Sequence, residues 1–192
     1  MEFTKKLPNY ASFSKLIETN SIYVDKTGII ANFAKSKGPY LLTRPRRFGK
    51  STLINTLHEL FAHGTEKFKG LEIEPLWDDK TYKVLHLDFS SYNFLSEFNF
   101  NDYFYADLKQ KFIELGFSID ESNMSLKTPA LLVDNAFKNN NSGEEIVLLV
   151  DEYDTPLSAV LNNEKEFLAR RDILHSFYSK VKEYQGRFRF IF

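Results

Sequence analysis

The run Gly49-Lys50-Ser51 combines residue types that can hold a nucleotide triphosphate, and it follows a short apolar segment and a basic turn. A turn that leads into a helix N-terminus aims backbone N–H groups at phosphate oxygens. The Lys50 ammonium can reach the β- and γ-phosphates and stabilise the transferred group, and the Ser51 hydroxyl can ligate Mg²⁺. The sequence therefore predicts a phosphate-binding loop for ATP and Mg²⁺. Its predicted nucleotide contacts are Arg46, Arg47, Phe48, Gly49, Lys50, Ser51 and Thr52.

A second chemical signal, Asp151-Glu152, directly follows the apolar run 146–150. Ligands of open α/β sheets bind at the carboxyl ends of the strands, where this pair is expected to lie. We predict that Asp151 holds Mg²⁺ together with Ser51, directly or through water. Glu152 is predicted to polarise the water that attacks the γ-phosphate. A purely structural acid at a strand end remains the alternative for Glu152.

The predicted loop departs from the general pattern G-x-x-x-x-G-K-S/T at its first position, where this chain has Arg44 instead of Gly. Pro45 fixes its own φ, so the turn can still form. Arg46 and Arg47 add positive charge to the pocket. Phosphate binding and solvated turn charges are equally compatible with these two arginines.

The elements that must position these residues alternate between strands and helices. The apolar patterns predict strands at 40–43, 84–89, 146–150 and 188–192, and helices at 12–19, 26–37, 50–63, 101–115, from 128 onward and at 163–184. Unbroken apolar strands are typical of a parallel sheet that is covered on both faces, with the helices as right-handed crossovers. The predicted fold class is therefore α/β, a three-layer P-loop NTPase with a mainly parallel sheet.

The composition limits the classes of function. The chain has 192 residues, of which 43% are hydrophobic, enough for one sizeable core. The 25 basic and 26 acidic residues leave a net charge of −1, so a large nucleic-acid surface is not supported. With no Cys, the chain has no disulfide or thiolate metal site. No signal peptide or membrane span is expected, so the predicted location is cytoplasmic. The aromatic residues at 89–105 are expected to form core or a partner surface.

Three phrases of this chain, in this order, resemble the predicted AAA-ATPase-like family of bacterial and archaeal proteins. The phrases are Tyr23-Val24-Asp25-Lys26-Thr27, Leu42-Thr43-Arg44-Pro45-Arg46-Arg47-Phe48-Gly49-Lys50-Ser51 and Asp151-Glu152-Tyr153-Asp154-Thr155-Pro156. The family normally has Arg at the position of Arg44. The resemblance implies an AAA-like P-loop fold, Mg-ATP bound by Lys50 and Ser51, Asp151 on the metal side and Glu152 as the base. It assigns no role to Asp25, Lys26 or Asp154.

Members of that family are usually longer, and many carry a nuclease-like domain after the ATPase part. The segment 186–192 resembles the family's sensor strand, which should lie between the phosphate-loop strand and the Asp151 strand. We therefore expect a helical extension at 1–38 and a partial P-loop core at 39–192, truncated after the sensor strand. ATP hydrolysis is expected of the complete protein. The alternatives are a non-hydrolysing, nucleotide-dependent interaction module, or an inactive remnant that needs a separate C-terminal chain.

Overall fold

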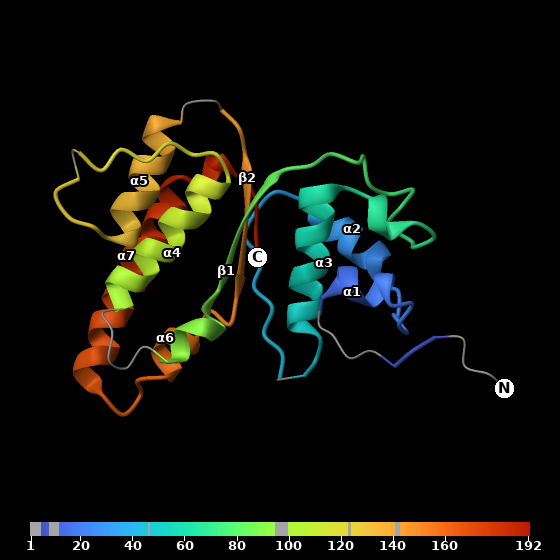
Figure 1. Cartoon of the computed structure of the whole chain (residues 1–192), viewed down its shortest axis with the longest axis horizontal. Helices are drawn as coiled ribbons and strands as arrows, with labels where there is room; N and C mark the ends of the chain where they lie inside the picture. The colour runs from blue at the N-terminus through green and yellow to red at the C-terminus, as the bar shows by residue number, and fades with distance from the viewer. Residues whose placement is uncertain (1–4, 8–11, 46, 95–99, 123, 141–142) are drawn as a thin grey trace. The chain divides into compact units, whose positions relative to one another are not determined.

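The structure is a computed structural model that describes residues 5–7, 12–45, 47–94, 100–122, 124–140 and 143–192 (Figure 1). The chain divides into two compact units. The first contains Met1–Val84, Ile146–Leu149 and Arg189–Phe192, and the second contains Leu85–Glu145 and Val150–Phe188. Helices alternate with three parallel strands, which is consistent with the predicted α/β P-loop-like fold.

The sheet has the strand order β1-β2-β3, with β1 at Lys83–Asp88, β2 at Ile146–Asp151 and β3 at Phe188–Ile191. Within the first unit, the Phe192 N–H donates to the Leu148 carbonyl oxygen (2.9 Å). The neighbouring Ile191 instead accepts from the Tyr40 N–H (2.8 Å) and forms a parallel bridge with Pro39. The end of β3 therefore lies between β2 and the segment before the phosphate loop, as predicted.

The predicted buried strand at 40–43 is wrong. Beyond the single bridge at Pro39, residues 40–45 have no regular secondary structure. Leu41 is 73% exposed and Thr43 is exposed, whereas Tyr40 and Leu42 are half-buried. Tyr40 packs against the core of the first unit, but the run pairs too briefly with β3 to form a strand.

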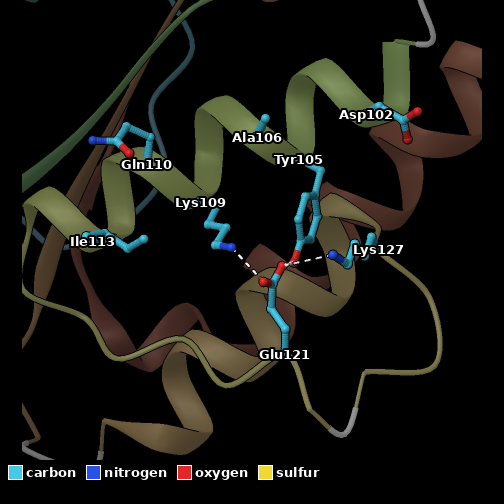
Figure 2. Close-up of a pocket in the computed structure, with 8 residues that line it drawn as sticks. All are labelled: Asp102, Tyr105, Ala106, Lys109, Gln110, Ile113, Glu121 and Lys127. Atoms are coloured by element: carbon cyan, nitrogen blue, oxygen red, sulfur yellow. Dashed lines mark hydrogen bonds and ion pairs between the residues drawn. The ribbon is translucent and has the colours of Figure 1, made fainter.

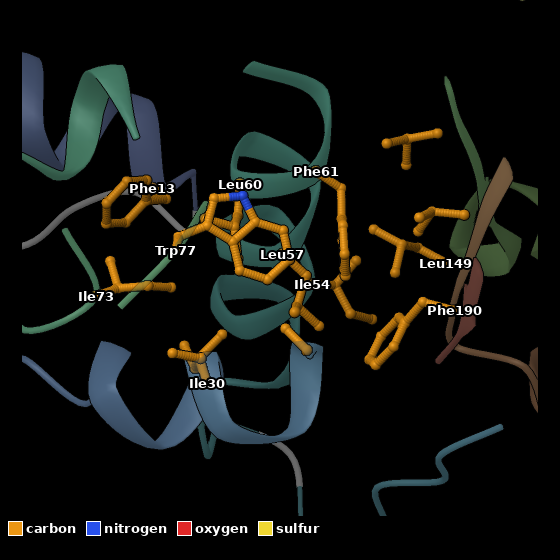
Figure 3. Packing of buried hydrophobic residues seen from close by; sticks show 14 of the residues in the cluster. Phe13, Ile30, Ile54, Leu57, Leu60, Phe61, Ile73, Trp77, Leu149 and Phe190 are labelled. Carbon is orange, nitrogen blue, oxygen red and sulfur yellow. The ribbon is translucent and has the colours of Figure 1, made fainter. Parts of the chain in front are cut away.

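The core of the first unit surrounds α3 (Lys50–His63), whose buried face is shown in Figure 3. Ile54, Leu57, Leu60 and Phe61 follow the predicted helical spacing and are all buried. The Phe61 ring lies 5.0 Å from that of Phe190 in β3. Gly64 ends the helix with φ +70°, a conformation that favours glycine. The other helices of this unit are α1 (Phe13–Glu18), α2 (Thr27–Ala34) and the 3₁₀ turn η1 (Glu66–Phe68).

The second unit is mainly helical. Its elements are η2 (Phe89–Phe94), α4 (Phe100–Glu114), α5 (Pro129–Asn139), α6 (Thr155–Ser158), α7 (Glu164–Glu183) and η3 (Gln185–Arg187). The helices α4, α5 and α7 pack against one another (Figure 1). The predicted helix starts are confirmed at Thr128 and Asn163, whose side chains accept the N–H groups of Leu131 and Glu166.

Most of the described aromatic residues at 89–105 form core in this unit, whereas Tyr103 is 41% exposed. Phe89, Tyr92 and Phe104 are buried, and the rings of Phe104 and Phe177 lie 4.9 Å apart. Phe98 lies outside the described residues. α4 already contains Phe100, so the predicted caps Asn101 and Asp102 are instead part of the helix. The short α6 was not predicted. None of the described helices is long and apolar enough to cross a membrane.

Candidate functional site

The N-terminus of α3 carries the predicted phosphate loop. The helix begins at Lys50, and the first bond of its ladder joins the Leu53 N–H to the Gly49 carbonyl oxygen (2.9 Å). Gly49 is the N-cap residue, and no described side chain caps this end. By contrast, Thr128 and Asn163 cap α5 and α7. The first-turn N–H groups of α3 therefore keep the unsatisfied donors that bind anions at helix ends.

The loop backbone turns through two left-handed residues, Arg47 with φ +66° and Gly49 with φ +76°. Left-handed residues within a turn bring successive N–H groups to one concave side, as in anion-binding nests. The conformation is unfavourable for Arg47 by roughly 1–2 kcal/mol, since its Cβ crowds the backbone. A Cβ at Gly49 would meet no atom within 4 Å, so glycine is favoured there by its φ rather than by space.

The loop side chains differ in exposure. Arg44, Arg47 and Phe48 are exposed, Lys50, Ser51 and Thr52 are half-buried, and Arg46 lies outside the described residues. The Asn55 Nδ2 donates to the Ser51 carbonyl oxygen (2.7 Å), and the Thr56 hydroxyl donates to the Thr52 carbonyl oxygen (2.8 Å). These bonds along the first turns of α3 fix the backbone that presents Lys50 and Ser51.

The predicted metal-side acid, Asp151, is the last residue of β2 and is 8% exposed. Its Oδ1 accepts the Glu152 N–H (2.9 Å). Glu152 is half-buried and left-handed, with φ +51°, and its carbonyl oxygen accepts the Thr155 N–H (3.0 Å). β2 therefore ends at Asp151 in a tight turn, which the bond between the Thr155 N–H and the Glu152 carbonyl oxygen closes.

The oxygen atoms of Asp151 and Ser51 are of the kind that bind Mg²⁺ together with nucleotide phosphates. No group of three or more His, Cys, Asp or Glu side chains within the described ranges could hold a metal ion by itself. Mg²⁺ is usually bound through one or two carboxylates, water and substrate phosphates rather than by an all-protein cage. Asp151 and the Ser51 hydroxyl match such a partial set in kind. Each belongs to its own unit, Ser51 to the first and Asp151 to the second.

Asp25, to which the sequence assigned no role, fixes the start of α2. Its Oδ1 accepts from the Thr27 N–H (2.8 Å) and hydroxyl (2.6 Å), and its Oδ2 accepts the Glu72 N–H (2.8 Å). The Thr27 hydroxyl in turn accepts the Ile73 N–H (3.1 Å). Although burial raises the pKa of Asp25, the bonds from Thr27 and Glu72 outweigh it and hold that pKa below its usual value.

This Asp25 clamp joins α2 to residues 72–73, and glycine at position 28 permits the close approach. A Cβ there would lie 2.5 Å from the Glu72 Oε2. An Asp two residues before a Thr at a helix start is a capping signal that the sequence does contain. The partner at Glu72 has no such signal. Asp154 is the N-cap residue of α6, but its side chain makes no capping bond.

A pocket of about 490 Å³ lies in the second unit, between α4 and the segment that holds Glu121 and Lys127 (Figure 2). The Glu121 carboxylate accepts from the Tyr105 hydroxyl (2.5 Å) and the Lys109 ammonium (2.6 Å), and Lys127 lies 3.7 Å away. The hydrogen bond from Lys109, followed by that from Tyr105, lowers the pKa of Glu121 to about 2. Because these charges satisfy one another, the pocket is a poor candidate for a nucleotide site.

Comparisons with known proteins show the family to which the chain belongs. A family model described as "Predicted AAA-ATPase" matches residues 9–192. A relative from Azotobacter chroococcum mcd 1, named "Uncharacterized protein in vnfD 5'region", is 33% identical over 202 residues. The match covers 97% of this chain and 36% of that relative, so the chain spans about a third of the relative's length. No solved structure matches the chain.

Proposed function

We propose that this chain, which belongs to the predicted AAA-ATPase family, binds Mg-ATP at the N-terminus of α3, and that the complete protein hydrolyses ATP to ADP and phosphate. Membership of the family suggests nucleotide binding in general. One observation carries the more specific proposal. The uncapped first turn of α3 follows a left-handed Gly49 and contains both Lys50 and Ser51.

In this proposal the phosphates bind to the N–H groups of the loop and the first turn of α3. The Lys50 ammonium neutralises charge on the β- and γ-phosphates, and the Ser51 hydroxyl ligates the magnesium ion. Arg47 adds positive charge from the loop, and Arg46 and Phe48 complete the proposed contacts with Gly49 and Thr52. Phosphoryl transfer depends mainly on positioning and electrostatics, so these contacts supply most of the required chemistry.

Asp151 and Glu152 supply the second half of the proposed site. In the first unit, β3 lies between β2 and the segment 38–40. All three run parallel. Parallel neighbours send their carboxyl ends to the same edge, where nucleotides bind in such sheets. That the two halves share one ligand is a proposal from their residue types and spacing. Asp151 would hold the magnesium ion, and Glu152 would orient the attacking water and accept its proton.

Thermal unfolding with and without Mg-ATP tests the binding step. A ligand at a hundredfold excess over its Kd stabilises the native state by about 2.7 kcal/mol. We expect a clear rise in Tm for the wild type and for Glu152→Gln, and none for Lys50→Ala. Lys26→Ala is the matched control, since it removes another lysine of the first unit and should keep the shift. A cooperatively melting wild type without a shift would refute ATP binding.

Phosphate release then tests hydrolysis. The complete wild-type protein should release phosphate from Mg-ATP. Its Glu152→Gln variant should bind the nucleotide but release phosphate at least about 10²-fold more slowly, the scale of a lost general base. Binding without turnover in the wild type would favour the alternative of a nucleotide-dependent interaction module over an ATPase.

A further inference from the structure

Arg170 is a charged side chain in the interior of the second unit. It lies on the buried face of α7 with Leu174, Phe177 and Val181, and only 1% of it is exposed. The neighbouring Arg171 has a 53% exposed side chain. Taking a guanidinium out of water is unfavourable unless the site compensates it, so buried arginines need specific partners.

The described partners of Arg170 come from three elements. Its Nη1 donates to the carbonyl oxygen of Pro156 in α6 (3.3 Å). Its guanidinium lies 5.4 Å from the ring centroid of Phe100, at the start of α4. Glu166, one turn earlier in α7, has its Oε2 3.8 Å from the Nε. Arg170 therefore joins α7 to α6 by a directed hydrogen bond and to α4 through an aromatic face.

The segment held by this bond is the turn that follows β2. Pro156 follows Glu152 by four positions, and the Glu152 carbonyl oxygen accepts the Thr155 N–H (3.0 Å). Thr155 and Pro156 are both buried, and α6 packs against η2 as well as α7. Glu152 itself is left-handed, with φ +51°. Such a residue keeps an unfavourable conformation only where its surroundings fix it.

We propose that Arg170 is a positioning residue for Glu152. Through the Pro156 carbonyl it holds α6 in place, and α6 holds the left-handed turn that sets the direction of the Glu152 carboxylate. The inference rests on the proposed function, because that direction matters only if Glu152 orients the attacking water. Arg170 does not itself contact the nucleotide in this proposal.

Hydrogen exchange tests the positioning step without any need for catalysis. Arg170→Met keeps an unbranched apolar stem but removes the donor to Pro156. The protection of the Thr155 amide should fall on the order of tenfold, while the amides of β2 and the middle of α7 keep theirs. Arg171→Met, which changes the exposed neighbour, is the matched control. It should leave the protection of the Thr155 amide and of the other amides unchanged. Unchanged protection at Thr155 in Arg170→Met would overturn the proposal whether or not the protein hydrolyses ATP.

Kinetics of the full chain test the catalytic consequence. In Arg170→Met, kcat should fall about 10²-fold, the scale of a small misplacement of a catalytic group, with KM and the Mg-ATP thermal shift unchanged. The double variant with Glu152→Gln should be no slower than Glu152→Gln alone, because Arg170 acts only through Glu152. A purely structural role would instead lower Tm, binding and kcat together and would add to the Glu152→Gln effect.

Arg170→Lys is the second variant if Arg170→Met does not fold, since it keeps the positive charge and N–H donors on a single ammonium group. It should recover part of the Thr155 protection and part of kcat. Loss of Thr155 protection with an unchanged kcat would overturn the proposal. If the wild type shifts with Mg-ATP but releases no phosphate, the hydrolytic part of the proposed function fails, and the catalytic role of Arg170 fails with it. No thermal shift in the wild type would refute nucleotide binding itself.

Discussion

At the scale of single residues, the Asp25 carboxylate joins two segments of the first unit by three hydrogen bonds. It accepts hydrogen bonds from the Thr27 N–H and hydroxyl and from the Glu72 N–H. Asp25→Ala should lower the free energy of unfolding by about 1–3 kcal/mol, because it removes a helix cap and leaves the Glu72 N–H without its partner. Urea denaturation measures the change.

The matched control for Asp25→Ala is Lys26→Ala. Lys26 is exposed and makes no capping bond, so its loss should change the free energy of unfolding by less than about 0.5 kcal/mol. Equal losses in the two variants would contradict a clamp at Asp25.

Glu121 gives a pH-dependent contribution to stability. Its pKa falls from an ordinary value of 4.5 to about 2, mainly through the hydrogen bond from Lys109. The contribution should therefore be complete above pH 4.5 and be lost as the pH falls toward 2, since the unfolded state takes up the proton first. At pH 7, Glu121→Gln should melt below the wild type, and the difference should shrink over that window.

Glu114→Gln removes the same charge from an exposed position of α4, and it controls for the change in net charge. A difference in Tm between the wild type and Glu121→Gln that stays constant from pH 7 to pH 2 would rule out this role for Glu121.

At the scale of elements, Arg189 connects β3 to the end of α2. Its guanidinium donates to the carbonyl oxygens of Ala34 (3.1 Å), Lys35 (2.8 Å) and Ser36 (3.1 Å), and it is 9% exposed. These carbonyls form the negative end of the helix, where a cation is favourable. These bonds hold the end of α2, and Ser36 lies two positions before the 38–40 segment, which pairs with β3 and leads to the phosphate loop.

Arg189→Met should therefore lower the free energy of unfolding by about 1–3 kcal/mol, because three carbonyl groups lose a charged donor. Arg189→Lys should recover only part of the loss, since one ammonium cannot reproduce the planar fork of donors. Urea denaturation of the two variants measures both effects. An Arg189→Met protein as stable as the wild type would show that water replaces the arginine fully.

At the scale of the whole molecule, the three strands belong to both compact units. β1, β2 and β3 each contribute residues to the first and to the second unit. Neither unit therefore contains a complete strand of the sheet, and we expect the two to unfold together. Trp77, the single tryptophan, lies in the core of the first unit and reports on it by fluorescence.

Phe104→Ala tests this coupling, because Phe104 is fully buried in the second unit. The substitution should lower stability by about 3–5 kcal/mol. If the units are coupled, the midpoint followed by Trp77 fluorescence should fall together with that followed by circular dichroism. Ile113→Ala, at an exposed position of the same helix, is the control. A Trp77 midpoint that does not move in Phe104→Ala would mean that the units unfold independently.

Local patterns in the sequence determined most of the elements that carry the candidate site. The buried face of α3, the caps Thr128 and Asn163, β1 to β3 and the order of β2, β3 and the loop segment all agree with prediction. These features depend on residues close together in the chain, or on topological rules for parallel sheets. The proposed roles of Lys50, Ser51, Asp151 and Glu152 stay predictions from their types and spacing.

Only the tertiary structure decided the roles of residues whose partners are distant in sequence. Asp25 meets Glu72 47 positions away, and Arg189 reaches Ala34 across 155 positions. Arg170 and Arg171 are adjacent in sequence, yet one is buried and the other exposed. Leu41 is apolar but largely exposed, since its segment meets β3 at only one bridge. Burial and pairing depend on what the rest of the chain brings to a position, and no local pattern contains that information.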